Sequence, residues 1–122
     1  MKIILADDHA ILRESLKELL EERGLQVVGE ASNGREAIDL VVKHKPNVAV
    51  MDLGMPLLNG IEAAREISRV APQTQTILLT MFEEDDYILN ALRAGVRGYV
   101  LKGQATADLV KAIQSVMRGS VY

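Results

Sequence analysis

The sequence predicts an α/β protein in which five strands form one doubly wound parallel sheet. Three observations support this prediction. Short apolar runs of strand length alternate five times with longer stretches whose apolar residues recur at helical spacing. The middle run, Val48 to Met51, is apolar throughout, as expected for a strand covered on both faces. The 122 residues suffice for a single domain.

The expected strands follow one another at regular intervals along the chain. They cover residues 3–6, 25–31, 48–51, 76–80 and 98–101. The second strand carries Gln26 and Glu30, so we expect it at an edge of the sheet. Right-handed crossovers, with the first strand flanked on both sides, give the strand order 2-1-3-4-5.

A helix is expected after each strand. The helices span residues 10–23, 33–46, 59–72 and 83–95, and the last starts at Thr106 or Ala107. Asn33 and Asn59 each precede a Glu by three residues, a spacing that predicts a capping box at both helix starts. The inward-facing positions are expected to be Leu12, Leu16, Leu19, Leu20, Ala37, Ile38, Val41, Val42, Ile61, Ala64, Ile67, Val70, Ile88, Ala91, Leu92, Leu109, Ile113, Val116 and Met117.

Composition excludes several classes of function. The chain has no cysteine, which rules out disulfides, thiolate metal sites and cysteine catalysis. Its net charge of −3 argues against a basic nucleic-acid-binding face. No apolar run reaches transmembrane length, and the N-terminal run is too short for a signal peptide. We therefore expect a cytoplasmic protein that does not associate with membranes.

Chemically reactive side chains follow four of the five strands. Asp7 and Asp8 follow the first strand, Asp52 the third, Thr80 ends the fourth, and Lys102 follows the fifth. Parallel strands place their carboxyl ends at one edge of the sheet, where ligands collect in this architecture. Each residue alone has an ordinary explanation as a turn cap, a strand-end hydroxyl or a solvated charge. Together, at the matching strand ends, they predict one site.

Three clustered carboxylates need a cation, because two charges ~4 Å apart repel by about 4 kcal/mol at a surface-like dielectric. Carboxylates, a backbone carbonyl and water are ligands that suit Mg²⁺. Lys102 can hold an anion, and Thr80 can donate to an anionic oxygen. The set describes an acidic residue that receives a phosphoryl group beside a metal ion.

These residues carry a family resemblance over essentially the whole chain. Asp7-Asp8-His9, Met51-Asp52-Leu-Gly-Met-Pro56, Leu79-Thr80 and Gly98-Tyr-Val-Leu-Lys102 resemble the receiver domain of bacterial two-component response regulators. The segment at residues 91–102 most resembles the NarL/FixJ (LuxR-type) branch. The resemblance implies the flavodoxin-like (βα)5 fold of the CheY-like receivers.

The resemblance also implies a role for each matched residue. Asp52 would accept phosphate from a sensor histidine kinase. Asp8 and Asp52 would bind Mg²⁺ directly, the Gly54 carbonyl would add a ligand, and Asp7 would act mainly through water. The protein would be a phospho-acceptor rather than an enzyme, at most phosphorylating itself from small donors and dephosphorylating itself.

Two further roles follow from the same resemblance. Thr80 and Lys102 would contact the phosphoryl oxygens, and Tyr99 would change rotamer together with Thr80. The sequence departs from the common receiver pattern at Leu57, Met81 and Gly103, and none of these changes removes a reactive group. Met81 and Phe82 are large apolar residues that cannot orient an attacking water, so slow hydrolysis of the phosphoryl group is expected.

The expected partners lie outside this single domain. Members of the NarL/FixJ branch usually add a C-terminal helix-turn-helix, so DNA binding would require a domain that follows residue 122. We expect a phosphorylation-dependent homodimer through the fourth helix, the fifth strand and the last helix, with contacts from Asp86, Leu89, Asn90, Arg93, Arg97 and Tyr99. The first or last helix is the alternative dimer face.

Other functions compete with this interpretation. A phosphohydrolase with an Asp nucleophile of the haloacid-dehalogenase type needs a second acid two residues on, where this chain has Gly54. A flavin carrier needs a hydroxyl- and glycine-rich phosphate loop after the first strand, where Asp7 and Asp8 would repel the phosphate. A degenerate docking receiver conflicts with the intact acid set. A stand-alone receiver that acts through protein contacts remains the alternative within the family.

Overall fold

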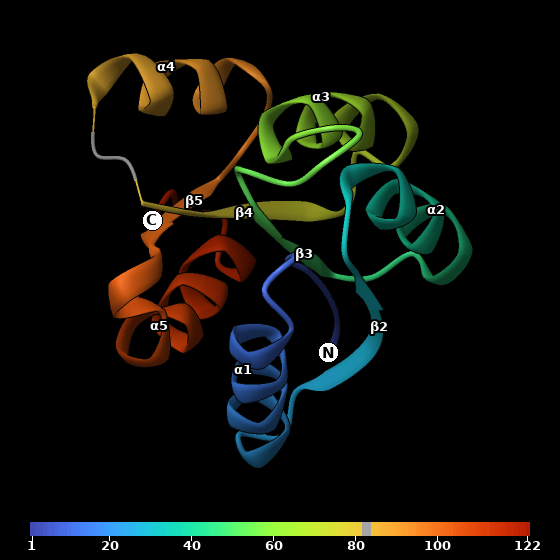
Figure 1. The fold of residues 1–122 in the computed structure, drawn as a ribbon, viewed down its shortest axis with the longest axis vertical. Helices are drawn as coiled ribbons and strands as arrows, with labels where there is room; N and C mark the ends of the chain where they lie inside the picture. The colour runs from blue at the N-terminus through green and yellow to red at the C-terminus, as the bar shows by residue number, and fades with distance from the viewer. Residues whose placement is uncertain (82–83) are drawn as a thin grey trace.

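The computed structural model describes residues 1–81 and 84–122. Its parallel sheet has the order β2-β1-β3-β4-β5, which confirms the predicted fold class and strand order (Figure 1). The strands are β1 (Lys2–Ala6), β2 (Gln26–Ala31), β3 (Val48–Asp52), β4 (Gln75–Thr80) and β5 (Gly98–Leu101). The helices are α1 (Ala10–Glu22), α2 (Gly34–His44), α3 (Gly60–Val70), α4 (Asp85–Arg93), the short 3₁₀ helix η1 (Lys102–Gln104) and α5 (Ala105–Met117).

The helices cover the sheet in two layers. Helices α1 and α5 lie on one face, and α2, α3 and α4 lie on the other (Figure 1). Alternate residues of the central strands belong to two separate apolar cores. Ile3, Leu5 and Val50 pack toward α1 and α5. Ile4 and Met51 pack toward α2 and α3. This alternation follows from the two-residue period of a strand. The sheet is thereby held rigidly between two apolar layers.

Strand β3 lies at the centre of the sheet and is buried along its whole length, from Val48 to Asp52. Strand β2 lies at an edge and keeps Gln26 and Glu30 exposed, as its polar residues predicted. Because β3 pairs with β1 on one side and β4 on the other, its last residue emerges between the ends of both neighbours.

A glycine and a helix cap fix the chain directly after β3. The Gly60 N–H donates to the Leu53 carbonyl at 3.0 Å, and a Cβ at position 60 would stand 2.6 Å from the Asp52 carbonyl oxygen. Only glycine lets α3 begin this close to the strand. The predicted capping box is present, since the side chains of Asn59 and Glu62 each accept from the other's backbone N–H, at 2.8 and 3.0 Å.

The other predicted capping box, at α2, is only half right. The Asn33 side chain accepts from the Glu36 N–H at 2.8 Å, as expected. The Glu36 carboxylate reaches one residue further back and accepts from the Ser32 N–H at 3.1 Å and the Ser32 hydroxyl at 2.9 Å. These bonds to Ser32 hold the pKa of Glu36 below its usual value.

Several helix positions expected to face inward are exposed. Val42, Val70, Leu92 and Met117 retain between 38% and 55% of their surface. Each lies at the margin of the apolar stripe of its helix. The last helix begins at Ala105, slightly earlier than predicted, and the predicted opening of α4 at Glu83 lies outside the described residues.

The loop that follows β3 contains a departure from the common receiver pattern. Leu57, at a position where glycine is common, has a φ of 68°, in the left-handed region that favours glycine. Its side chain is 78% exposed, so packing does not compensate for this conformation. The loop therefore carries local backbone strain at Leu57.

The C-terminal segment returns to the sheet. The Tyr122 N–H donates to the Arg97 carbonyl at 2.9 Å, and the chain end lies beside β5 (Figure 1). In the described part of the chain, the helices are too short or too polar to cross a membrane.

Candidate functional site

The ends of β1, β3, β4 and β5 bring the predicted site residues together. Lys102 Nζ lies 3.1 Å from Asp52 Oδ2 and 3.3 Å from both Asp7 carboxylate oxygens. Asp7, Asp52 and Thr80 are at most 4% exposed, and the Lys102 side chain is 10% exposed. A buried ammonium thus bridges two buried carboxylates at the edge of the sheet where the sequence predicted a site.

Asp7 is held by its own loop and by the first turn of α1. Oδ1 accepts from the His9 N–H at 2.8 Å, and Arg13 Nη1 donates to the Asp7 carbonyl at 2.6 Å. Among the described residues, Oδ2 of Asp7 has no hydrogen-bond partner, although Lys102 Nζ lies near it. The ion pair with Lys102, at 3.3 Å, compensates this buried oxygen in part, and a bound cation or water would supply a further contact.

Burial raises the pKa of Asp52 above its usual value, and the negative charge of Asp7 adds to this effect. Lys102 acts in the opposite direction, as does the Gly54 N–H, which donates to Asp52 Oδ1 at 3.3 Å. The charged form of Asp52 is therefore disfavoured despite its ammonium neighbour, and further positive charge at this point would stabilise it.

A candidate metal site is formed by Asp7, Asp8, His9 and Asp52. Each of them offers one ligand atom, and these atoms all lie within 4.8 Å of one another. Two ligands on opposite sides of Mg²⁺ are about 4.2 Å apart, so the group needs little movement to hold an ion. The three carboxylates, which together carry more negative charge than Lys102 neutralises, fit a hard divalent cation.

The Asp52 carboxylate opens into a hollow of about 120 Å³. The hollow is lined by His9, Asp52, Leu53, Gly54, Thr80, Met81 and Lys102. Met81 is 78% exposed and stands at this hollow, whereas Phe82, the other large residue expected there, lies outside the described residues. Gly54, the expected carbonyl ligand, also lines the hollow.

Thr80 and Tyr99, the predicted switch pair, are in contact. Tyr99 packs against the core beneath α4, and burial raises the pKa of its phenol, whereas a hydrogen bond with Thr80 lowers it. Thr80 also lines the hollow in front of Asp52. One hydroxyl group therefore joins the acidic site to the aromatic ring on β5.

Sequence reasoning missed two groups at this site. It gave His9 no role; the side chain is 65% exposed, yet its Nδ1 lies 3.1 Å from Asp7 Oδ1 and 2.7 Å from Lys102 Nζ. It did not consider Arg13, which ties the loop to Asp7 and forms an ion pair with Glu30 at 3.1 Å. The spacing of Arg13 one turn inside the first helix was a usable signal, because that position lies above the preceding loop.

Comparison with known proteins places this site in a family. Residues 3–114 match the model described as the response regulator receiver domain. The chain belongs to the response regulator receiver domain family. This membership makes it a signalling domain, and the resemblance stated from the sequence is confirmed.

The relatives agree on the branch. The chain is 39% identical to the oxygen regulatory protein NreC of Staphylococcus haemolyticus, with all of the chain and 57% of that protein aligned. It is 39% identical to a LuxR-family response regulator structure from Aurantimonas (TM-score 0.93, covering 98% of this chain and 86% of that one). The receiver domain of NarL from Mycobacterium tuberculosis is 31% identical (TM-score 0.92, covering 97% and 96%). The chain is thus a receiver of the NarL/LuxR type.

Proposed function

We propose that Asp52 accepts a phosphoryl group from a phosphohistidine of a sensor histidine kinase, in a reaction that requires Mg²⁺. The observation that supports this most strongly is the single hollow shared by Asp52, Thr80 and Lys102. A nucleophilic carboxylate there faces a hydroxyl donor and an ammonium, which are the groups that a transferred phosphoryl oxygen needs.

The transfer exchanges one bond to phosphorus for another. An Asp52 oxygen forms a bond to phosphorus, the phosphorus–nitrogen bond of the phosphohistidine breaks, and its electron pair stays on the leaving imidazole. Lys102 then exchanges its contact with Asp52 Oδ2, now 3.1 Å, for a contact with a phosphoryl oxygen. Thr80 donates to a second phosphoryl oxygen. Small phosphodonors such as acetyl phosphate serve the same reaction.

Asp8 and Asp52, with the Gly54 carbonyl, would hold the Mg²⁺, and Asp7 would contribute mainly through water. The ion supplies charge neutralisation at the phosphoryl oxygens when bound. Asp8 is suited to exchange a ligand with solvent because 37% of its side chain is exposed, whereas Asp7 is held by His9 and Lys102.

The Thr80–Tyr99 contact is proposed as the route by which phosphorylation alters a distant face. The Thr80 hydroxyl has one proton, so when it donates to the phosphoryl group its hydrogen bond with Tyr99 must change. Helix α4 lies above Tyr99. The structure describes all nine residues of α4, and Ala91 is the one among them that is fully buried. A helix held by so few buried side chains needs little free energy to shift.

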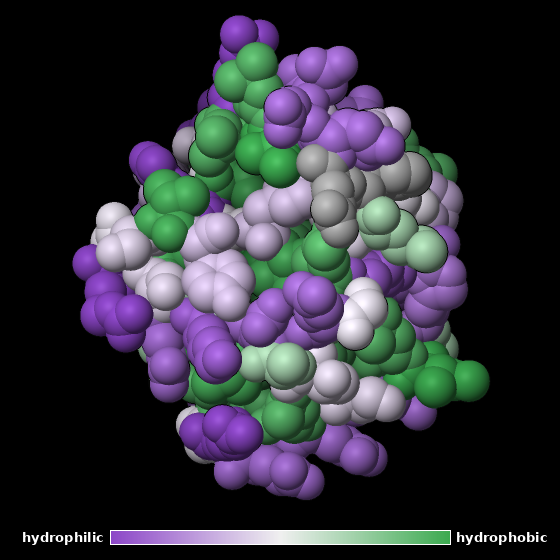
Figure 2. All heavy atoms as spheres, turned by 90° about the vertical axis from the view of Figure 1, so that its left-hand side faces the viewer, coloured by the Kyte–Doolittle hydropathy of each residue, from purple (hydrophilic) through white to green (hydrophobic). Residues whose placement is uncertain are grey.

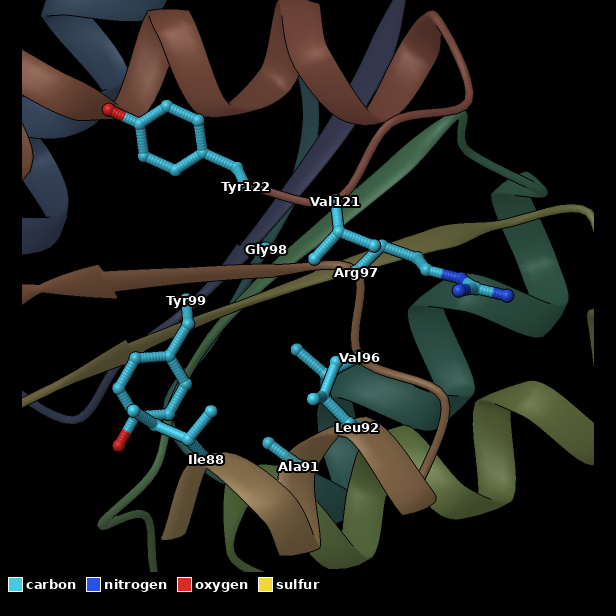
Figure 3. A pocket seen from close by; sticks show the side chains of 9 residues that line it. All are labelled: Ile88, Ala91, Leu92, Val96, Arg97, Gly98, Tyr99, Val121 and Tyr122. Carbon is cyan, nitrogen blue, oxygen red and sulfur yellow. The ribbon is translucent and has the colours of Figure 1, made fainter. Parts of the chain in front are cut away.

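The α4–β5 face is proposed as the surface of a phosphorylation-dependent homodimer. Of the residues expected to make contacts, Asp86, Leu89, Asn90, Arg93 and Arg97 are exposed there and Tyr99 is partly buried. Figure 2 shows apolar groups alternating with charged groups on this side of the molecule. A hollow of about 80 Å³ lies between α4 and β5, with Tyr99 and Leu92 on one side and the C-terminal Val121 and Tyr122 on the other (Figure 3).

The dimer proposal is tested by sedimentation with and without beryllofluoride, a phosphoryl mimic. The wild-type receiver should dimerise with the mimic, and a variant with Arg93→Glu and Arg97→Glu should remain monomeric. A variant with Arg23→Glu and Arg65→Glu, which changes the same charge away from this face, serves as control. This face is excluded if the wild type is a monomer with and without the mimic. It is also excluded if the variant with Arg93→Glu and Arg97→Glu dimerises as strongly as the wild type.

The output is proposed to be control of a DNA-binding domain. The chain spans 57% of the NreC relatives that it matches, and one of the similar structures is a DNA-binding response regulator of the LuxR family from Staphylococcus aureus. Dimerisation of the receiver would bring two such domains together on DNA. A receiver that acts through protein contacts alone would bind no DNA in its full-length form.

Phosphoryl acceptance is tested by incubating the protein with acetyl phosphate and Mg²⁺. The intact mass should increase by one phosphoryl group, and Asp52→Asn should stay unlabelled. Catalytic turnover of a phosphate ester, with release of many phosphates per protein, would instead support the phosphohydrolase. Labelling of the Asp52→Asn variant to the wild-type level would show that another residue accepts the group.

A further inference from the structure

The chain after α5 turns back to the edge of the sheet. Gly119 follows the helix with a φ of 85°, in the left-handed region. The Gly119 N–H donates to the Val116 carbonyl at 3.1 Å, and the Ser120 N–H donates to the Ser115 carbonyl at 3.0 Å. This pair of hydrogen bonds is the Schellman motif, which ends a helix and redirects the chain. Because glycine adopts this conformation without steric cost, the reversal is encoded in the sequence.

The redirected segment, residues 119–122, is termed the strap and contacts three elements. The Tyr122 N–H donates to the carbonyl of Arg97, directly before β5, at 2.9 Å. The Tyr122 hydroxyl donates to the Asp108 carboxylate on α5. Val121 lines the hollow of about 80 Å³ between α4 and β5 (Figure 3). The strap therefore extends from α5 across the edge of β5 to α4.

The strap lies where a partner receiver would bind. Strand β5 is the last strand of the sheet, and an edge strand presents backbone groups with which another chain can pair. The strap already occupies the Arg97 carbonyl there. Val121 and Tyr122 keep 56% and 39% of their surface, so a second copy approaching the α4–β5 face meets them first. The strap and a partner therefore compete for the same edge and the same hollow.

The same hollow connects the strap to the switch pair. Tyr99 lines it together with Val121, as Figure 3 shows. When Thr80 turns to a phosphoryl group, rotation of Tyr99 changes the wall against which Val121 packs. The described contacts of Val121 and Tyr122 are a backbone hydrogen bond, a hydroxyl hydrogen bond and the packing of a half-exposed side chain. A segment held in this way opens locally at a small cost in free energy.

We propose that residues 119–122 form an autoinhibitory strap, which covers the α4–β5 face of the unphosphorylated receiver and leaves it when Tyr99 rotates. The inference rests on the proposed dimerisation, because a strap inhibits only a face that binds a partner. The apparent affinity of a protein is reduced by the fraction of molecules that are competent to bind. A strap docked in about 90% of molecules therefore weakens the binding of each protomer ~10-fold.

The test compares the wild type with Gly119→Val, which disfavours the turn into the strap, and with Gly24→Val as the matched control. Gly24 ends α1 with a φ of 80°, and a Cβ at either glycine meets nothing within 4 Å. Both variants should lose similar stability, because both place a branched side chain in the left-handed region. Only Gly119→Val should speed hydrogen exchange of the Tyr122 amide, by at least ~10-fold, and tighten dimerisation without beryllofluoride to a similar extent.

A second pair of variants leaves the glycine turn unchanged. Val121→Ser should also speed exchange of the Tyr122 amide and tighten dimerisation, whereas Val42→Ser, at a position 55% exposed on α2, should do neither. A rapidly exchanging Tyr122 amide in the wild type, or a released strap with unchanged or weaker dimerisation, overturns the inference and leaves the dimer proposal intact. A monomer in every protein, with and without beryllofluoride, contradicts the dimer proposal and the inhibitory role with it.

Discussion

Replacing Asp52 by Asn is expected to stabilise the folded receiver in the absence of divalent cations. The change removes one charge from a side chain that is 4% exposed and keeps its shape. The ligand atoms of Asp7 and Asp8 lie within 4.8 Å of that of Asp52, a separation at which each pair of like charges repels by about 3.5 kcal/mol at an effective dielectric of 20. Lys102, at 3.1 Å, attracts by about 5 kcal/mol on the same scale.

The two repulsions together exceed the attraction by between about 1 and 2 kcal/mol. Burial of the Asp52 charge adds to this difference, and solvent screening of the half-exposed Asp8 reduces it. The direction of the Asp52 pKa shift gives the same sign, because burial and Asp7 outweigh Lys102. We therefore expect Asp52→Asn to raise the free energy of unfolding by about 1–2 kcal/mol near pH 7.

Urea unfolding as a function of pH measures this effect. Because the pKa of Asp52 is raised in the folded state, the folded protein holds a proton that the unfolded chain has already lost. The wild type therefore loses stability as the pH rises from the usual value of 3.8 through the folded pKa of Asp52, whereas the Asp52→Asn variant lacks this contribution. The difference between the two proteins should be small in acid and largest near neutral pH.

Two controls make the prediction refutable. Asp39→Asn, at an exposed position of α2, should change stability by less than about 0.5 kcal/mol. Mg²⁺ at about ten times its Kd should stabilise the wild type by about 1.4 kcal/mol and leave the Asp52→Asn variant unchanged. An Asp52→Asn variant that is less stable than the wild type at neutral pH, or a difference independent of pH, would refute the electrostatic reasoning.

The remaining predictions concern the metal, the phosphoryl lifetime and the packing after β3. Asp8→Ala should fold normally and gain stability from the loss of repulsion, yet bind Mg²⁺ poorly in a calorimetric titration; unchanged affinity would remove Asp8 from the metal site. Met81→Ala should speed dephosphorylation by opening the hollow to water, whereas Met117→Ala on α5 should not, and equal decay rates in all three proteins would place the control of access elsewhere. Gly60→Ala should lower the free energy of unfolding by about 1–3 kcal/mol, because its Cβ would stand 2.6 Å from a backbone oxygen. Gly54→Ala, whose Cβ meets nothing within 4 Å, is the matched control, and equal losses in the two variants would show that the close approach is unimportant.

The sequence was sufficient to predict the convergence of Asp7, Asp52 and Lys102. In a parallel sheet, side chains that follow the strands must emerge at one edge, so the order of strands decides which of them meet. The ammonium of Lys102 between the two carboxylates, at 3.1 and 3.3 Å, follows from that order. The match of residues 3–114 to the receiver domain family agrees with the predicted family.

The inward turn of His9 could not be predicted, because it depends on the path of the loop rather than on spacing. The hydrogen bond from its own N–H to Asp7, at 2.8 Å, rotates the backbone so that the ring lies over the cluster. Arg13 stabilises the same loop through the Asp7 carbonyl. The spacing of Arg13 could have indicated its contact, whereas the His9 contact has no periodic signature, since it depends on a few backbone dihedral angles.

The apolar spacing of the helices also predicted burial wrongly for residues at the margins of the apolar stripes. Leu92 belongs to the stripe of α4, but α4 lies beside β5, the last strand of the sheet, so no further strand covers that flank. Its apolar side chain instead lines the hollow that the C-terminal Val121 and Tyr122 close (Figure 3). Spacing specifies which residues share a face, but not how far the neighbouring element extends.

The most direct test of the central claim is to locate the phosphoryl group within the chain. After incubation with acetyl phosphate and Mg²⁺, borohydride reduction converts an aspartyl phosphate to homoserine, and peptide mass spectrometry identifies the modified position. We expect homoserine at position 52 alone, with Asp7 and Asp8 unmodified, and no modification when Mg²⁺ is removed by a chelator. Homoserine at position 7 or 8, or at position 52 to the same extent without a divalent cation, would contradict it.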